Sequence, residues 1–183
     1  MATKALLIVD MQAGSFTPAT PRYESEKVIE KINQLASFFR LKGNLVIFIR
    51  HDGTNEGYFL PGSEHWQIIP ELIQLPGDIY VEKTINDSFY HSRLESTLRE
   101  SGINELYFVG CATDFCVDAT IKSALGKDFD VTVVKDAHTT ADRPFVSAKN
   151  LIDHHNWLWS ELTPAAFPLK LIPTREIIEN LKD

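Results

Sequence analysis

Apolar residues follow two patterns along the chain: short, nearly continuous runs, and longer segments with apolar positions every three or four residues. The runs predict strands at residues 4–10, 44–50, 78–81, 105–109, 131–134 and 169–172. The periodic segments predict helices at residues 25–42, 87–101, 114–126, 144–160 and 174–182. Fully apolar strands that alternate with helices are typical of a parallel sheet buried on both faces. We therefore expect a three-layer α/β/α, Rossmann-like fold with a mainly parallel sheet of about six strands.

One long stretch, residues 51–74, shows neither pattern and contains several glycines and prolines. Loops of this length inside a compact domain usually form lids or binding walls. The apolar side chains expected to line a pocket there are Phe16, Tyr58, Phe59, Leu60 and Trp66. Packing in the core or at a subunit interface explains the same side chains equally well.

Chemically active side chains follow the predicted strands at the points where they end. They are Asp10, His51, Lys83, Cys116 and Asp136. In parallel α/β sheets, ligands bind beyond the carboxyl ends of the strands. The sequence therefore predicts that these side chains meet at one edge of the sheet.

Cys116 lies near the start of a predicted helix, where unpaired backbone N–H groups and the helix dipole favour a thiolate. An acid, an amine and a thiol at strand ends are the components of a covalent catalytic site. Asp10 could take the thiol proton, while Lys83 could hold Asp10 and favour the thiolate. The alternative is that Cys116 is a small buried hydrophobic residue, Asp10 a turn residue and Lys83 a solvated lysine. If the site is catalytic, His51 and Phe115 are expected to contact the substrate.

Composition and charge exclude several classes of partner. The net charge of −7 and the lack of a Lys/Arg cluster argue against nucleic acid. No apolar stretch approaches the roughly 20 residues of a membrane span. The first residues show no signal-peptide pattern, so we expect a cytoplasmic protein. In that reducing compartment a disulfide between Cys111 and Cys116 is not expected, and two cysteines alone cannot complete a structural zinc site.

The segment around Cys116 resembles the nucleophile motif of the isochorismatase-like cysteine hydrolases, roughly G-x-x-T-x-x-C-V-x-x-T. The residues at those places are Gly110, Thr113, Cys116, Val117 and Thr120. Three more segments match in the same order: the first strand with Asp10 and the D-x-Q pattern, residues 81–89 around Lys83, and Asp136 after the fifth strand. The similarity extends over nearly the whole chain, so residues 1–183 are expected to form a single domain of this kind.

The resemblance implies a catalytic triad of Asp10, Lys83 and Cys116, without metal or cofactor. It also implies a cis peptide bond at Cys111–Ala112, with backbone N–H groups of Ala112 and Cys116 forming an oxyanion hole. The implied reaction cleaves a C–N bond of a small amide, carbamoyl or ureido substrate through a thioester on Cys116. Asp10 would be the general base and acid, and Lys83 its electrostatic support. A homo-oligomer, either a dimer or a tetramer, is also implied.

Three alternatives stay open from the sequence. Family members that hydrolyse nicotinamide carry a metal site after the second strand, for which His51, Asp52 and His65 are the available residues here. True isochorismatases cleave a vinyl ether, although Cys116 favours amide substrates. The third alternative is a protein of another class, a binding or redox-responsive protein in which Cys111 and Cys116 sense oxidants without turnover.

Overall fold

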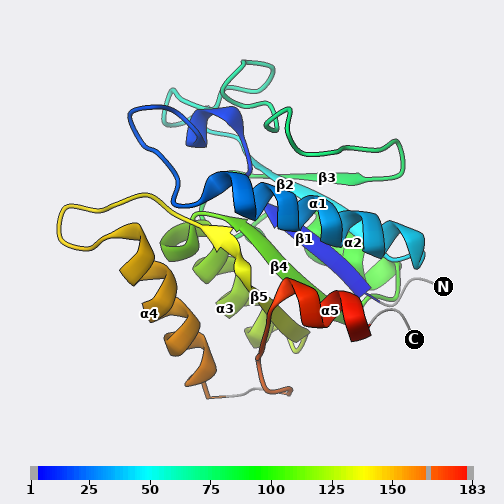
Figure 1. Ribbon diagram of the computed structural model, residues 1–183. Coiled ribbons are helices and arrows are strands. Elements are labelled where there is room, and N and C mark those ends of the chain that lie inside the picture. The colour runs from blue at the N-terminus through cyan, green and yellow to red at the C-terminus, as the bar shows by residue number, and fades with distance from the viewer. Residues whose placement is uncertain (1–3, 164–165, 181–183) are drawn as a thin grey trace.

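The six predicted strands form one sheet, and every neighbouring pair of strands is parallel. A computed structural model describes residues 4–163 and 166–180. The strands are β1 Lys4–Val9, β2 Leu45–His51, β3 Ile79–Lys83, β4 Glu105–Cys111, β5 Asp130–Thr139 and β6 Lys170–Ile172. Their order across the sheet is β3-β2-β1-β4-β5-β6 (Figure 1). The predicted parallel α/β architecture is therefore confirmed.

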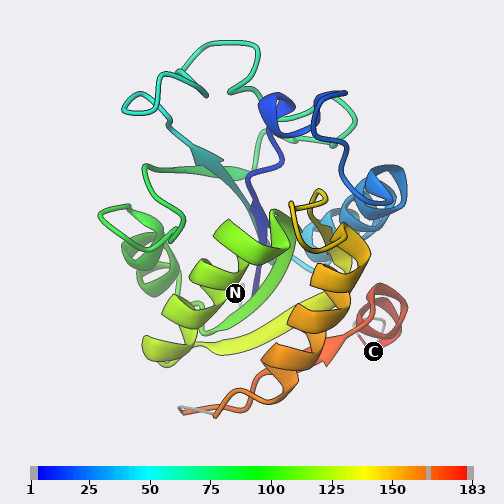
Figure 2. The ribbon, with the colours of Figure 1, turned by 90° about the vertical axis from the view of Figure 1, so that its left-hand side faces the viewer.

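Helices cover both faces of the sheet and complete three layers. One face carries α1 Ser25–Leu41 and α5 Thr174–Asn180, while the other carries α2 Leu94–Glu100, α3 Asp118–Gly126 and α4 Ala148–Ser160 (Figures 1 and 2). Two short helical turns, η1 Ala13–Ser15 and η2 Thr113–Val117, follow β1 and β4. The predicted end of the last helix at residue 182 lies outside the described residues.

Alternation along the buried strands divides the core into two halves. In β1, Leu6 and Ile8 pack with α1 and α5, while Leu7 and Val9 pack with the helices of the other face. All four side chains are fully buried. This two-sided burial explains why β1 is apolar at every position from Ala5 to Val9, because each face of the sheet needs its own apolar layer. Within the described residues, no helix is both long and apolar enough to cross a membrane.

Two helices begin later than the sequence pattern predicts, because local side chains bond the backbone first. The segment before α2 forms turns in which Ser92 Oγ donates to the Ser88 carbonyl and accepts from the Leu94 N–H. Before α4, Ser147 accepts from the Asn150 N–H and caps the helix. Serine side chains commonly offer the backbone such alternatives to helix. The predicted starts at residues 87 and 144 are therefore wrong by several positions.

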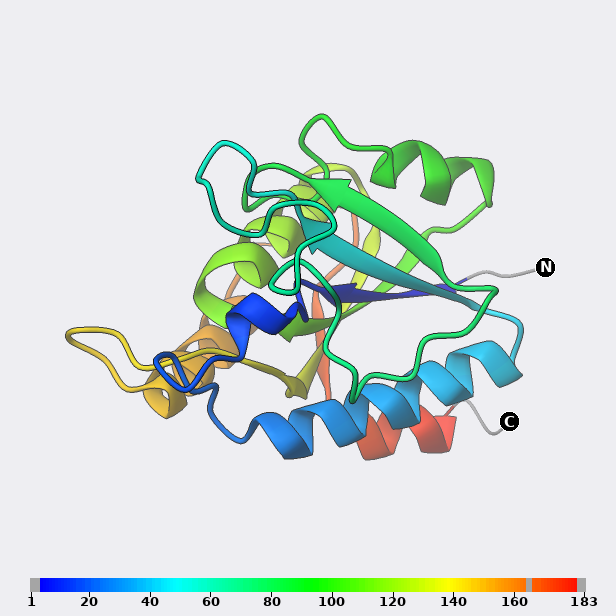
Figure 3. The same ribbon diagram turned by 90° about the horizontal axis from the view of Figure 1, so that it is seen from above.

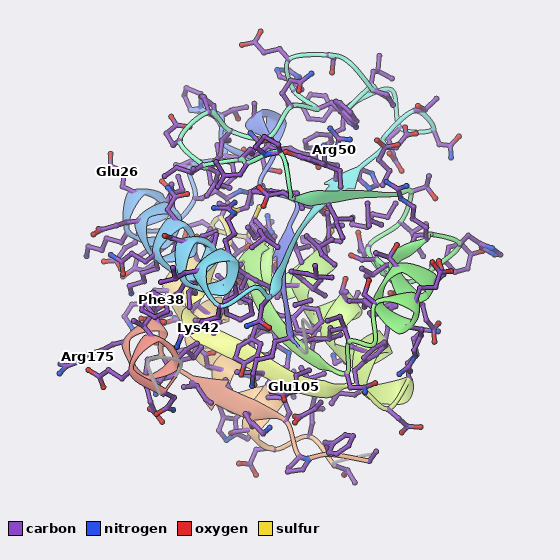
Figure 4. The ribbon with its side chains drawn as sticks, turned by 90° about the vertical axis from the view of Figure 1, so that its right-hand side faces the viewer. Glu26, Phe38, Lys42, Arg50, Glu105 and Arg175 are labelled. Atoms are coloured by element: carbon purple, nitrogen blue, oxygen red, sulfur yellow. The ribbon has the colours of Figure 1, made fainter. Side chains whose placement is uncertain are left out.

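The predicted long loop is confirmed, since residues 52–78 join β2 to β3 without regular helix or strand. Backbone hydrogen bonds fix part of it over the segment that follows β1, including Ala13 N–H to Gln67 O at 2.8 Å and Ile69 N–H to Met11 O at 3.0 Å (Figure 3). This part of the loop therefore lies at the carboxyl edge of the sheet, beside the end of β1. Figure 4 labels Arg50, near the end of β2, and Glu105, the first residue of β4.

A single glycine allows β4 to lie close against β1 just before the sheet ends. Gly110 has a φ of 117°, and a Cβ built there would lie 2.2 Å from the carbonyl oxygen of Val9. Gly110→Ala is therefore expected to lower the free energy of unfolding by about 3 kcal/mol or more. Gly126→Ala, in a helical position with nothing near the added Cβ, is the matched control and should stabilise slightly. Urea unfolding of both variants measures the difference, and equal effects would contradict this explanation.

Candidate active site

Three side chains from three strand ends meet at the carboxyl edge of the sheet. Asp10 follows β1, Lys83 ends β3, and Cys116 lies in η2 after β4. Nζ of Lys83 lies 2.7 Å from Oδ2 of Asp10 and 3.4 Å from Sγ of Cys116. The side chains of Lys83 and Asp10 are 0% and 7% exposed, so this ion pair is withdrawn from water. The predicted convergence of the three groups is present in the fold.

The backbone leaves regular geometry beside each of the two strands that carry Asp10 and Cys116. Asp10 has a φ of 46°, in the left-handed region that aspartate tolerates better than most residues. The peptide bond between Cys111 and Ala112 is cis, as the resemblance implied. The chain then forms a π-helical turn, and not the α-helix predicted from residue 114, before α3 begins. Such turns occur often at functional sites, and this one places Cys116 in the wall of a cavity.

The surroundings of Cys116 favour its protonated thiol over the thiolate. Burial raises the pKa of Cys116, and the nearby Asp10 carboxylate raises it further, while the Lys83 ammonium acts in the opposite direction. Lys83 acts in the expected direction but does not outweigh burial, so a base is needed to take the proton of this thiol. Sγ also lies 3.6 Å from Oδ1 of Asn86, which can accept the thiol proton in a hydrogen bond.

The position of Asp10 beside Lys83 favours the charged form of the lysine. Burial acts to lower the pKa of Lys83, but the Asp10 carboxylate and Cys116 outweigh it and leave that pKa raised. Oδ1 of Asp10 is buried and accepts no hydrogen bond from another described residue. One oxygen of the carboxylate is thus occupied by Lys83, and the other is available to a proton.

His51 and Glu56 complete the surroundings of the lysine. Nδ1 of His51 lies 3.4 Å from Nζ of Lys83, and Nε2 lies 3.1 Å from Oε2 of Glu56. A neutral ring that accepts at Nδ1 and donates at Nε2 satisfies both contacts. The three N–H groups of Lys83 then have three acceptors: Asp10, Cys116 and His51. Gln12 fixes the backbone of His51 through hydrogen bonds of 2.7 and 3.0 Å.

A cavity of about 260 Å³ opens beside the thiol. Of the residues predicted for the site, its lining includes Asp10, His51, Phe59, Ala112, Phe115 and Cys116. It also includes five residues without a predicted place in it: Gln12, Ser15, Arg22, Asn86 and Arg143. A cavity of this volume accommodates a small molecule.

The other predicted pocket aromatics lie elsewhere. Phe16 packs against the core beneath α1. The hydroxyl of Tyr58 donates to the Gly14 carbonyl at 3.2 Å, and its ring borders a second, more open hollow. The ring of Trp66 lies 3.8 Å from the guanidinium carbon of Arg50. None of these three side chains lines the cavity beside Cys116.

Asp136 is also far from its predicted place. Strand β5 continues past it to Thr139, so Asp136 does not lie at a strand end. Its carboxylate accepts from the backbone and hydroxyl of Thr174 at 2.8 and 2.9 Å, and pairs with Lys31 at 3.0 Å. Asp136 therefore caps the start of α5, and the prediction that it faces the site is wrong.

The residues after β2 do not fit a metal site of the nicotinamidase kind. Both ring nitrogens of His51 already contact other side chains, and the ring of His65 packs 4.7 Å from that of Tyr58. Asp52 accepts from the backbone and hydroxyl of Thr54. In the described part of the chain, no three His, Cys, Asp or Glu side chains are grouped to hold a metal ion.

One structural rule could have found the residues that sequence analysis missed. Arg22 lies in the segment after β1, Asn86 in the turn after β3, and Arg143 in the loop after β5. All three segments leave carboxyl ends of strands, where site residues gather. Their polar side chains show no periodic pattern, so only this placement distinguishes them from ordinary surface residues.

Comparison with known proteins agrees with this geometry. A family model, the isochorismatase domain, matches residues 4–159. The chain is 30% identical over 141 residues to streptothricin hydrolase from Streptomyces noursei, covering 77% of this chain and 56% of that protein. It is 28% identical over 202 residues to ureidoacrylate amidohydrolase RutB from Caulobacter segnis, covering 90% of this chain and 84% of that protein.

A solved structure of similar fold is a putative isochorismatase hydrolase from Oleispira antarctica. It superposes with a TM-score of 0.86 at 29% identity, covering 97% of this chain and 96% of that one. The chain spans only about half the length of the streptothricin hydrolases that it matches. The family match itself covers most of the chain and includes Asp10, Lys83 and Cys116. The chain belongs to the isochorismatase family.

Proposed function

We propose that the protein is a cysteine hydrolase that cleaves a C–N bond of a small amide, carbamoyl or ureido compound. The observation that carries this proposal is the meeting of Asp10, Lys83 and Cys116 at a cavity of about 260 Å³. Two relatives support the choice of bond, since one is named a ureidoacrylate amidohydrolase and the other a streptothricin hydrolase. A thiol nucleophile with an adjacent base is the arrangement that acyl transfer requires.

The first step is attack by sulfur on the carbonyl carbon of the substrate. Asp10 takes the proton of Cys116 through the carboxylate oxygen that Lys83 does not occupy. Because burial raises the pKa of this thiol, the proton leaves as the C–S bond forms. Lys83 then stabilises the sulfur as it gains negative charge.

Backbone N–H groups of Ala112 and Cys116 are assigned to the developing oxyanion. Both residues line the cavity, and Ala112 follows the cis peptide bond. The proton now on Asp10 passes to the departing nitrogen, which leaves as an amine or ammonia. Water, deprotonated by the same carboxylate, hydrolyses the thioester and restores the thiol.

The proposal includes a homo-oligomer, a dimer or a tetramer, in the cytoplasm. Large apolar side chains stand exposed on the surface, notably Phe145 at 96% and Trp157 at 58% exposure. Burial of such side chains against a second copy is the simplest way to remove them from water. Light scattering after gel filtration measures the mass, and a monomer at micromolar concentration would contradict this part.

The test of the proposed function is a panel of small amides, carbamoyl compounds and ureido acids, with nicotinamide included, assayed for release of ammonia or amine. The Cys116→Ala protein serves as the blank. We expect turnover of at least one member of the amide or ureido classes by the metal-free enzyme. Activity that appears only with added zinc or iron, or only on a vinyl ether, would overturn the proposal.

A further inference from the structure

Arg22 lies in the segment between η1 and α1 and lines the cavity beside Cys116. Two hydrogen bonds tie its neighbour Tyr23 to the end of β5: Tyr23 N–H to Thr140 O at 2.9 Å, and Thr139 Oγ1 to Tyr23 O at 2.7 Å. The Nε–H of Arg22 itself donates to the Ser15 carbonyl at 2.6 Å. The guanidinium is thus fixed in position before any ligand arrives.

The charges around this cavity balance except at Arg22. The Asp10 carboxylate pairs with Lys83 at 2.7 Å, and Arg143 pairs with Asp114 through contacts of 2.7 and 3.0 Å. Arg22 has no carboxylate partner among residues 4–163 and 166–180. The cavity lining therefore contains one uncompensated positive charge.

Part of the Arg22 guanidinium also lacks a hydrogen-bond acceptor. Its Nη1 atom is buried and has no partner in the described part of the chain. Buried donors in native proteins are almost always paired, and a charged donor without an acceptor is costly. A fixed arginine that carries both an unmatched charge and an unmatched donor is poised for an anionic ligand.

The Arg22 guanidinium lines the same cavity as Asp10 and Cys116, at the carboxyl edge of the sheet. Its positive charge acts on Cys111, the residue directly before Ala112 in the proposed oxyanion hole. Arg22, Ala112 and Cys116 all line one cavity of about 260 Å³. A small molecule with its carbonyl carbon at Cys116 can therefore also reach Arg22.

We propose that Arg22 binds a carboxylate group of the substrate, so that the preferred substrates are amide or ureido acids and not their neutral analogues. This inference rests on the proposed hydrolase function and narrows its substrate class. The planar guanidinium suits a carboxylate because it can donate two parallel N–H bonds. If Arg22 only supports the backbone at Ser15, its replacement will affect acidic and neutral substrates alike.

The first experiment compares matched substrates in which one member carries a carboxylate and the other a methyl group at the same position. Suitable pairs are N-carbamoylglycine with ethylurea, and succinamate with butanamide. Wild-type kcat/KM should favour the acid of each pair, and Arg22→Met should remove about 10- to 100-fold of that preference through KM. Activity on the neutral member should fall by less than activity on the acid. Equal losses on both members, or a wild-type preference for the neutral member, would overturn the inference.

The second experiment does not depend on turnover. Iodoacetamide alkylation of Cys116, followed by peptide mass, is measured with succinate or with neutral 1,4-butanediol present. Succinate should slow alkylation of the wild type but not of Arg22→Met, while butanediol should slow neither. The proposed function fails if no compound of the whole panel reacts, whereas this protection assay still decides whether the carboxylate subsite exists. Equal protection of Arg22→Met and wild type, or none in either, rules the subsite out.

Two further variants separate the effect of Arg22 from its neighbours. Arg22→Lys keeps the charge but loses the fork of donors, so protection by succinate should be intermediate. Arg143→Met removes the other cavity guanidinium, whose charge Asp114 already balances. Its effect on the acid-to-neutral preference should be smaller than that of Arg22→Met. A larger effect from Arg143 would move the assignment to that residue and contradict ours.

Discussion

Cys116→Ala should lower kcat by about 10⁴-fold or more, because it removes the atom that forms the covalent intermediate. Cys111→Ala should retain most of the activity. The side chain of Cys111 is only 1% exposed, its thiol donates to the Asp10 carbonyl at 3.1 Å, and burial raises its pKa to about 11. Steady-state kinetics on the same substrate measure both variants.

The comparison of the two cysteines also tests the oxidant-sensing alternative. A thiol sensor would depend on both Cys111 and Cys116 and would show no turnover to lose. Thermal unfolding of each variant controls for misfolding, since a buried thiol replaced by alanine leaves a small cavity. Loss of activity in Cys111→Ala with unchanged folding would contradict the assignment of Cys116 as the nucleophile.

Lys83→Met should damage stability and activity together. The substitution leaves the Asp10 carboxylate buried without its partner, which typically costs about 3–5 kcal/mol. The double variant Asp10→Asn/Lys83→Met removes both charges, so it should regain much of that stability while staying inactive. Urea unfolding and initial rates of the single and double variants measure the two effects separately.

Asp10→Asn tests the role of Asp10 as the general base more directly than Lys83→Met does. Asparagine keeps the size of the side chain but cannot take the thiol proton, so activity should fall nearly as far as in Cys116→Ala. The amide oxygen can still accept from Lys83, but the buried ammonium loses its counter-charge, so urea unfolding of this variant must accompany the kinetics. Full activity in Asp10→Asn would show that another group removes the proton from Cys116.

The fold and the meeting of Asp10, Lys83 and Cys116 could be predicted because they rest on strong local patterns. Fully apolar strands separated by helices determine a buried parallel sheet, and the carboxyl ends of such strands meet by geometry. Asp10, Lys83 and Cys116 follow from that rule together with the resemblance around Gly110 and Cys116. Their separation of up to 106 positions along the chain disappears once β1, β3 and β4 share one sheet.

The remaining errors have physical causes that one sequence does not display. Burial and the Asp10 carboxylate raise the pKa of Cys116 by more than the neighbouring lysine lowers it. Asp136 follows an apolar run but sits within a strand that continues, and it binds a helix start instead of a ligand. Arg22 and Arg143 are ordinary loop arginines until the fold places them at the cavity.

The central claim is that an acyl group passes through the sulfur of Cys116. Its most direct test is to mix enzyme with a slowly hydrolysed substrate, quench with acid, and map the adduct by peptide mass spectrometry. The account predicts that the peptide containing Cys116 gains the mass of the acyl portion and loses it as hydrolysis proceeds. Sustained turnover with no adduct on Cys116, or with the acyl group on another residue, would contradict it.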